Sequence, residues 1–285
     1  MAQLASTIPN SKQYEEWNSA TGRRWLERHE AVDRQIAPFG RRAMDRADIK
    51  TGERILDVGC GCGETTLELA DRVGASGFVT GVDISRQLIE TARKRAQELA
   101  RVNVRFEEGD AQTCPFPTEG FDLVFSRFGI MFFDDPEAAF QHLGKALRPG
   151  GRLSFVCWPA PQENQFMTIP IAAASRHVTL PAPGEPDAPG PFAFADPERV
   201  RRILTRAGFA EIKTDRVIEK IGGGTRDETA RMLLELGPLS SILEEIDQKT
   251  RDAILEDIRT ALSSLESSER AWIDAASWLV TARVR

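Results

Sequence analysis

A glycine-rich turn within residues 54–70, RILDVGCGCGETTLELA, constrains the fold of this chain more than any other stretch. An apolar segment at 55–58 predicts a strand, and residues 65–73 predict a helix that ends at Gly74. Between them stand glycines at every second position, Gly59, Gly61 and Gly63. Glycines let the backbone come close to a ligand, and the free N–H groups at a helix start favour negative or electron-rich groups. The stretch therefore predicts a ligand-binding turn between a strand and a helix.

Strands and helices alternate through the rest of this region. The predicted strands are 78–83, 102–107, 121–126, 152–158, 210–218 and 276–284, and the predicted helices are 86–99, 137–147 and one that runs from 196 to 208. Such alternation is typical of a parallel sheet with helices on both faces. Ligands of these sheets lie beyond the carboxyl ends of the strands, so we expect the functional residues to gather there.

Other segments depart from this alternation. Residues 10–50 predict helices, with one turn at Ser19–Gly22 and a second near Pro38–Gly40. Residues 159–180 are apolar and partly helical, and 181–191 hold five prolines, which predicts a stiff, extended connector. Helices are expected at 226–236 and at 239–265, the second with an apolar face that ends at Leu265.

Composition excludes several classes of function. The formal net charge is −6, and no Lys/Arg stripe with interleaved aromatic residues indicates nucleic-acid binding. No apolar run approaches the ~20 residues that cross a bilayer, and the first residues lack the layout of a signal peptide, so we expect a cytoplasmic protein. Cys60 and Cys62 have no second Cys/His pair at zinc spacing, so we expect no metal site and reduced thiols.

The glycine spacing and the motifs that follow it carry a family resemblance. The spacing is G-x-G-x-G, whereas the dinucleotide fingerprint is G-x-G-x-x-G. In order, the chain gives LDVGCGCG, GVD, EGDAQ, FDLVFSRFG and LRPGGRL. This set resembles the class I S-adenosylmethionine (SAM) methyltransferases, in particular bacterial small-molecule enzymes related to quinone-biosynthesis and natural-product methyltransferases. The resemblance covers about residues 50–158.

The resemblance implies a fold and a division of the chain. The implied fold is α/β, a Rossmann-like seven-stranded, mostly parallel sheet with an antiparallel last strand, plus a helical cap. The expected parts are an N-terminal helical lid (1–50), a SAM-binding core (51–158), an insertion on the acceptor side (159–195), a core helix and strand (196–225), a helical cap (226–269) and the final core strand (270–285).

The resemblance also implies residues that bind the cofactor. In the family the glycine turn passes under the methionine part of SAM, Asp57 attracts its ammonium group, and Ser126 offers its backbone carbonyl to that group. Asp83 accepts both ribose hydroxyls, which a carboxylate can do in bidentate fashion. The full cofactor set expected here is Asp57, Gly59, Gly61, Gly63, Asp83, Ile84, Asp110, Ala111, Gln112 and Ser126.

The acceptor side is less constrained. The residues expected there are Tyr14, Trp17, Arg127 and Phe128. A hydroxyl acceptor gains from a general base, whereas an amine or activated carbon need not. His177 follows the fifth strand in the apolar insertion and is our candidate base. His29 is the alternative, and His142, in the middle of a predicted helix, is expected to be structural.

The leading functional hypothesis is a SAM-dependent methyltransferase that acts on a small-molecule acceptor by in-line displacement and releases S-adenosylhomocysteine. A non-catalytic SAM-binding sensor or partner subunit is the alternative from another class. A nicotinamide dehydrogenase fits the fold but not the glycine spacing. We expect neither nucleic acid nor membrane as a partner, and the sequence leaves a homodimer open.

Overall fold

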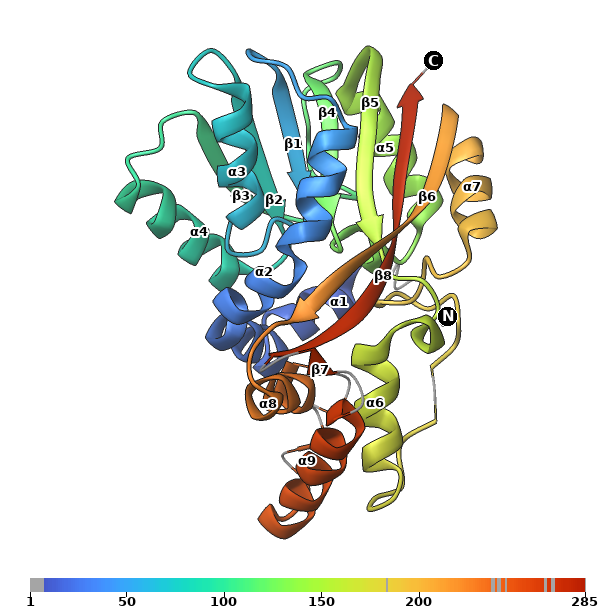
Figure 1. Cartoon of the computed structure of the whole chain (residues 1–285). Helices are drawn as coiled ribbons and strands as arrows, with labels where there is room; N and C mark the ends of the chain where they lie inside the picture. The colour runs from blue at the N-terminus through green and yellow to red at the C-terminus, as the bar shows by residue number, and fades with distance from the viewer. Residues whose placement is uncertain are drawn as a thin grey trace, which may run out of the picture.

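The core of the molecule is a seven-stranded sheet with the strand order β3-β2-β1-β4-β5-β8-β6 (Figure 1). The computed structural model describes residues 8–182, 184–236, 239, 242–243, 245–263, 266–267 and 270–284. The strands are β1 (Arg54–Val58), β2 (Phe78–Asp83), β3 (Val104–Glu108), β4 (Phe121–Arg127), β5 (Leu147–Cys157), β6 (Phe209–Gly222), the short β7 (Glu266–Ser267) and β8 (Arg270–Val284). Strand β8 runs antiparallel to β5 and β6, while β1 to β5 pair in parallel. The predicted α/β sheet with an antiparallel last strand is confirmed.

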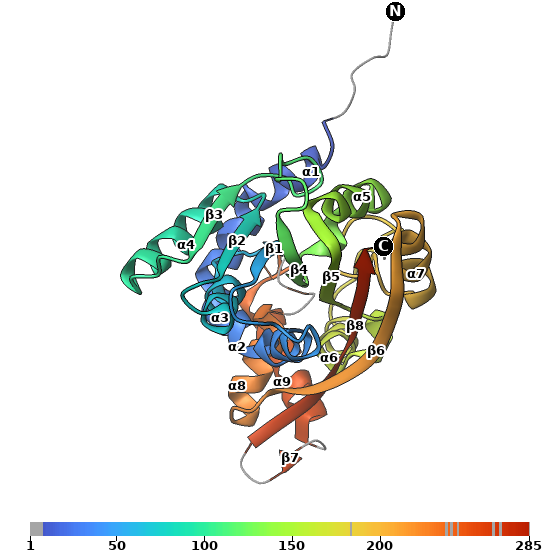
Figure 2. The ribbon, with the colours of Figure 1, turned by 90° about the horizontal axis from the view of Figure 1, so that it is seen from above.

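Helices cover both faces of the sheet (Figure 2). On one face lie α2 (Ala20–Arg46), α3 (Glu64–Val73) and α4 (Arg86–Glu98), and on the other lie α5 (Pro136–Ala146) and α7 (Pro197–Arg206). Fully buried Phe39, Phe125 and Phe155 contribute to the core between these layers. Burial on both faces explains why the parallel strands read as apolar runs in the sequence.

Side chains at helix starts fix two of the turns. The carboxylate of Asp135 accepts a hydrogen bond of 3.0 Å from the N–H of Ala138, with Pro136 in the first helical turn. Asp196 accepts from the N–H groups of Glu198 and Arg199 in the same way at the start of α7. These are favoured N-cap arrangements, and they confirm the predicted starts of both helices.

A cap lies beyond the carboxyl ends of the parallel strands. It contains α6 (Gln165–Ala174), α8 (Arg226–Leu236) and α9 (Gln248–Leu262), together with the far ends of β6 and β8 (Figure 1). The β6–β8 pairing continues from Phe209↔Val284 to Gly222↔Trp272, so this hairpin arm reaches from the sheet into the cap. Of the helices in the described residues, none is both long and apolar enough to cross a membrane.

The predicted second turn in the N-terminal helices is wrong. Helix α2 continues without a break through Pro38 to Arg46. A proline inside a helix removes one hydrogen bond and costs about 3 kcal/mol. Phe39 and Ala43 are both fully buried against the sheet, and this burial offsets the cost of the proline.

Other boundaries also differ from the predictions, among them those of α9, β6 and β8. Helix α9 begins at Gln248 rather than at 239, because Asp247 caps it by accepting a 2.7 Å hydrogen bond from the N–H of Thr250. Strand β6 continues to Gly222, and β8 begins already at Arg270, since Ala271, Ile273 and Ala275 alternate toward the core with no exposed surface. Leu265, predicted at the end of the apolar face, lies outside the described residues.

Candidate active site

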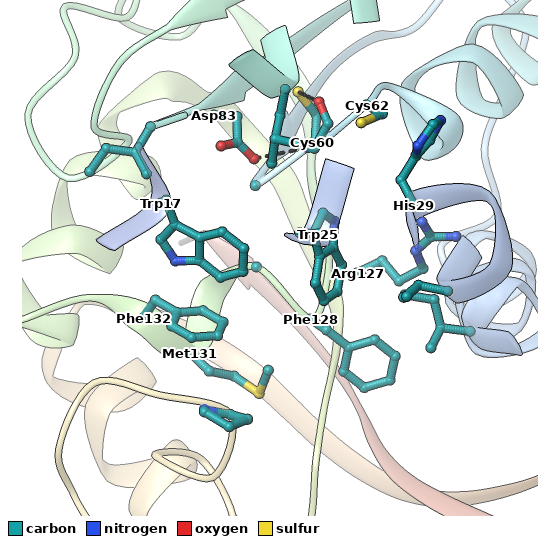
Figure 3. A pocket seen from close by; sticks show the side chains of 18 of the residues that line it. Trp17, Trp25, His29, Cys60, Cys62, Asp83, Arg127, Phe128, Met131 and Phe132 are labelled. Atoms are coloured by element: carbon teal, nitrogen blue, oxygen red, sulfur yellow. Dashed lines mark hydrogen bonds between the residues drawn. The ribbon is translucent and has the colours of Figure 1, made fainter. Parts of the chain in front are cut away.

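A single cavity of about 630 Å³ extends from the glycine turn to the cap. We call the part formed by residues 58–62, 82–84 and 109–111 the turn end of the cavity. We call the opposite part the cap end, and its apolar side chains are Phe128, Met131, Phe132, Trp158, Phe166, Met167, Phe192, Ile221, Met232, Leu233 and Leu236. One face of α2 forms a wall along both, and Figure 3 shows Trp17 and Trp25 between Asp83 of the turn end and Phe132, Met131 and Phe128 of the cap end.

The glycine turn exposes backbone to the cavity. Gly61 has a φ of +54°, and a side chain built on it meets no atom within 4 Å, so its absence leaves open space for a ligand. A Cβ on Gly59 would lie 2.7 Å from the Cα of Gly129, so this glycine lets two loops approach each other. Gly63 lies outside the cavity, and a Cβ there would lie 2.8 Å from the Phe106 ring. The structure therefore brings Gly59 and Gly61 to the cavity, while Gly63 serves helix packing.

Asp83 holds the turn in place at the end of β2. One carboxylate oxygen accepts a hydrogen bond of 2.9 Å from the N–H of Gly61, and the other accepts one of 2.9 Å from the N–H of Ser85. Burial raises the pKa of this carboxyl above its ordinary value, and the two N–H donors oppose that rise. Each oxygen keeps a second lone pair, so the side chain can still accept from a diol in the cavity.

Asp57 does not line the cavity. It is fully buried, and its Oδ2 accepts hydrogen bonds from the hydroxyls of Thr65 (2.6 Å) and Thr66 (2.7 Å), so it ties β1 to α3. Its Oδ1 has no hydrogen-bond partner among the described residues. Burial raises the pKa of Asp57 to about 6. The resemblance implied that this carboxylate contacts the ammonium group of the cofactor, but the structure does not bring it to the cavity.

The loop after β3 adds Asp110 and Ala111 to the turn end, beside Ile84. The Oδ1 of Asp110 accepts from the N–H of Gln112 and from Nδ2 of Asn10, both at 2.9 Å. Gln112 lies outside the cavity, where its Oε1 accepts from the same Asn10 amide at 3.2 Å. Asn10 is only 2% exposed. Its contribution to the site was not predicted from the sequence. An Asn at the N-cap position, directly before Ser11 of α1, was the available signal.

Helix α1 (Ser11–Trp17) crosses the turn end and is fastened at both of its ends. Before the helix, the N–H of Asn10 donates to Asp134 at 2.7 Å. After it, the backbone carbonyl of Trp17 accepts from the hydroxyl of Ser85 at 2.9 Å. The Trp17 ring lines the cavity, as expected, but Tyr14 is 43% exposed and lies outside it. Gln13, four residues before Trp17 and on the same helix face, also lines the cavity, as does Glu16.

The residues after β4 contribute an ion pair and an aromatic stack. The Arg127 guanidinium pairs with Asp33 of α2, and these side chains are 9% and 14% exposed. Burial raises the pKa of Asp33, although Arg127 opposes that rise. Phe128 adopts a φ of +59°, and its ring stacks on Trp158 with centroids 3.8 Å apart. Both Arg127 and Phe128 line the cavity, as the sequence predicted.

Two further expected residues do not bring their side chains to the cavity. The Ser126 side chain is fully buried, and its hydroxyl donates to the carbonyl of Val58 at 2.8 Å. The predicted contact between the Ser126 backbone carbonyl and the ammonium group stays a prediction. His177, the candidate base, follows α6 and faces α9, where its Nε2 lies 2.9 Å from the carboxylate of Asp257. The helix end turns this histidine away from the cavity, so the structure contradicts its predicted position.

Of the other two histidines, one lines the cavity and one does not. His29 of α2 lines the cavity, and its Nδ1 lies 2.6 Å from the carbonyl of Leu26. His142 is outside the cavity, with its Nε2 2.6 Å from the carbonyl of Cys114. Within the described ranges, no group of three or more His, Cys, Asp or Glu side chains is placed to hold a metal ion. Metal independence stays a prediction.

Comparisons with known proteins identify the family. Residues 55–151 match the family described as "Methyltransferase domain". Aklanonic acid methyltransferase of Streptomyces sp. (strain C5) is 38% identical over 135 residues, which are 47% of this chain and 61% of the relative. Demethylmenaquinone methyltransferase of Staphylococcus saprophyticus is 29% identical over 63% of this chain and 79% of its own. The chain therefore contains a methyltransferase domain, and its relatives support the class I SAM-dependent methyltransferase family.

A solved structure supports the fold of this methyltransferase. Phosphoethanolamine N-methyltransferase 2 of Haemonchus contortus, in complex with SAM, superposes with a TM-score of 0.54 and 20% identity. The match covers 87% of this chain and 53% of that one.

The turn end of this methyltransferase fits SAM. The open space at Gly61 admits a ligand against bare backbone, and Asp83 retains acceptor capacity for a ribose diol. Ile84 and Ala111 line the same part of the cavity and would supply apolar contact for an adenine ring. When bound, SAM supplies a methyl group on a sulfonium that leaves as a neutral thioether. The chain's own residues then hold the two reactants and exclude water.

Proposed function

We propose that this methyltransferase acts on a small, largely apolar acceptor with a flat ring system, bound at the cap end of the cavity. One observation carries the proposal: the glycine turn and the aromatic wall belong to one continuous cavity. Small-molecule sites are concave and mostly apolar, with few polar groups. The names of two relatives, which specify aklanonic acid and demethylmenaquinone as acceptors, support a small molecule.

Catalysis requires mainly positioning in this arrangement. The turn end orients the cofactor, and the stacked Phe128 and Trp158 offer a flat surface for the acceptor. Apolar side chains at the cap end exclude water that would compete for the methyl group. The acceptor atom would attack in line with the leaving group, and correct placement alone contributes several kcal/mol.

For a hydroxyl acceptor, we propose His29 rather than His177 as the base. Because Nδ1 of His29 donates to the Leu26 carbonyl in this assignment, its Nε2 is left to accept a proton. His29→Gln should lower kcat by roughly 100-fold, the scale of general base catalysis. His177→Gln is the matched control and should leave kcat unchanged. Equal kcat values in both variants would mean that no histidine base is used.

The expected lid and cap are also proposals. Helix α1 is fastened on both sides of the turn end, which supports residues 1–50 as a lid over the cofactor. Helices α6 and α8 contribute to the cap end, which supports 159–195 and 226–269 as acceptor-side segments. The parts 51–158, 196–225 and 270–285 would then form the core.

The function is tested with SAM that carries a labelled methyl group and a panel of aromatic acceptors. The expected result is labelled product with equimolar S-adenosylhomocysteine, and greater turnover for ring compounds than for phosphoethanolamine-like polar acceptors. Turnover of polar acceptors alone would refute the proposed acceptor class.

The remaining expectations concern compartment and assembly. All four cysteines are free thiols, which supports the proposed cytoplasmic location. The acidic net charge supports a small molecule rather than nucleic acid as the acceptor. A homodimer stays a prediction, which sedimentation of the purified chain would check.

A further inference from the structure

The Asp33–Arg127 ion pair is a buried charge pair on the wall of the cavity that the methyl transfer described above does not use. Both side chains line the cavity and retain little exposed surface. Buried ion pairs often stabilise a fold no better than apolar residues of the same size, because both charges lose their hydration. Stability alone therefore does not explain a buried ion pair on the lining of a cavity, and binding of a charged ligand group would explain it.

The pair lies against the glycine turn. Arg127 follows Ser126 at the end of β4, and Gly59 packs closely on Gly129 two residues further on. Gly40 of α2 makes room for the Arg127 side chain, since a Cβ there would lie 2.9 Å from Cδ of Arg127. Figure 3 shows Arg127 on the same side of the cavity as Cys62 and His29.

The charges around the pair are matched. Asp33 interacts electrostatically with Glu64 and Arg95, but these two form their own pair at 2.6 Å and do not line the cavity. Burial raises the pKa of the neighbouring Cys62 thiol, the negative charge of Asp33 adds to this rise, and the thiol stays neutral. The ion pair itself therefore presents one anion and one cation side by side, while the other carboxylates of the lining belong to Glu16, Asp83 and Asp110.

One anion beside one cation is complementary to a zwitterion. An anionic acceptor would meet Arg127 but also the repulsion of Asp33, and a cationic acceptor would meet the reverse. The α-amino-acid group of SAM carries an ammonium and a carboxylate on one carbon, so it satisfies both charges at once. Asp57, the residue that the resemblance gave to the ammonium, lies below the turn with two threonine hydroxyls on its Oδ2.

We propose that Asp33 and Arg127 bind the amino-acid group of SAM, Asp33 accepting hydrogen bonds from the ammonium and Arg127 donating to the carboxylate. This inference rests on the SAM-dependent function. Arg127 has further N–H groups beyond the one that donates to Asp33, and Asp33 has a second oxygen. Each can therefore keep the ion pair and bind the ligand as well.

Calorimetric titration of the full chain with two thioethers tests the proposal. S-adenosylhomocysteine carries the amino-acid group, whereas 5′-methylthioadenosine has the same adenosine and sulfur without it. Asp33→Asn and Arg127→Gln should each weaken S-adenosylhomocysteine binding about 10- to 100-fold, the range for charge-assisted hydrogen bonds. Binding of 5′-methylthioadenosine should change less than about twofold, and this binding also shows that the variant is folded.

Decarboxylated SAM separates the two roles. Its ammonium remains but its carboxylate is missing, so Asp33→Asn should weaken its binding while Arg127→Gln should not. Arg42→Gln is the matched control, because Arg42 lies on the same helix and pairs with Glu219 at the exposed surface. It should change none of the three affinities.

The outcomes are distinguishable. Equal losses for S-adenosylhomocysteine and 5′-methylthioadenosine would make the pair structural and overturn the proposal, as would unchanged affinities for both. If either single variant fails to fold, the double variant Asp33→Leu/Arg127→Met removes both charges together and receives the same two titrations. A wild-type chain that binds no S-adenosylhomocysteine would instead refute the SAM-dependent function itself.

Discussion

The turn end and the cap end of the cavity are built in different ways. At the turn end, short segments follow neighbouring parallel strands, and backbone hydrogen bonds fix the functional groups, as for Asp83 with Gly61 and Ser85. At the cap end, apolar side chains meet from segments far apart in the chain, such as Phe128, Phe166 and Met232. Directional bonds select one ligand geometry, whereas apolar contacts tolerate variation. The difference indicates a fixed cofactor site beside an adaptable acceptor site.

The strongest test of this contrast is Asp83→Ala. The variant loses two acceptors for the ribose hydroxyls and also the hydrogen bonds that hold Gly61 and Ser85. We expect the SAM binding free energy to weaken by about 4 kcal/mol, roughly 1000-fold, measured by calorimetry. Asp215→Ala, at an exposed pair on β6, is the control. Unchanged SAM affinity in Asp83→Ala would remove this residue from the site.

The second test concerns Asp57, which is buried outside the cavity and ties β1 to α3 through Thr65 and Thr66. Burial raises the pKa of Asp57 from 3.8 to about 6, so the folded chain keeps a proton between these values that the unfolded chain releases. The stability that this proton contributes is full below pH 3.8 and is lost as the pH rises through 6. The total is about 3 kcal/mol.

Urea unfolding of the wild type and Asp57→Asn at several pH values measures this contribution. Since the asparagine does not titrate, the free energy of unfolding of the wild type should fall relative to that of the variant by about 3 kcal/mol between pH 4 and 7.5. A difference that stays constant over this range would show that Asp57 titrates normally in the folded chain.

At the cap end, Phe166→Ala should affect the acceptor alone. Phe166 packs against Trp158 with centroids 4.9 Å apart and lines the cavity. Removing its apolar surface should weaken the binding of a ring acceptor by about 2 kcal/mol, which raises the KM roughly 30-fold. The affinity for SAM should stay unchanged. Steady-state kinetics and SAM titration measure the two quantities. A parallel loss of SAM affinity would break the distinction between the two ends.

The smallest effect is expected where the lid meets the turn end. Asn10→Ala removes the amide that bridges Asp110 and Gln112, and it should weaken SAM binding by about 1 kcal/mol. Calorimetry measures the loss. Asn103→Ala, whose amide caps the carbonyls of Ala70 and Gly74 away from the cavity, is the matched control. Equal affinities in the two variants would separate α1 from cofactor binding.

The turn end is the part of the candidate site that a sequence can predict, because that site is local. Glycine spacing and the acidic residues after β2 and β3 follow one another in chain order, and the sheet brings successive strand ends together. The pattern could not tell which side chains face the cavity. Asp57 has the expected chemistry, but its strand position directs its carboxylate into the core.

The cap end was beyond sequence reasoning for a physical reason. Its lining depends on how α6 and α8 pack. The position of His177 likewise depends on where α6 ends, and in the structure this side chain faces Asp257 instead of the cavity. Asp33 could have been found, because it is a charge on the face of α2 that also carries the apolar Trp25, Val32 and Ile36 at helical spacing. Such a charge on an otherwise apolar face predicts a partner or a ligand.

The hairpin arm of β6 and β8 has a consequence for how this enzyme can diversify. Residues 223–269 leave and re-enter the sheet between two strands that are already hydrogen-bonded to each other, at Gly222↔Trp272. The pairing of β6 with β8 holds both ends of this segment together, and it does not depend on the sequence between them. That segment carries Met232, Leu233 and Leu236 to the cap end of the cavity. The segment can therefore be exchanged between relatives. Such an exchange should change the acceptor preference and leave the turn end of the cavity unaltered.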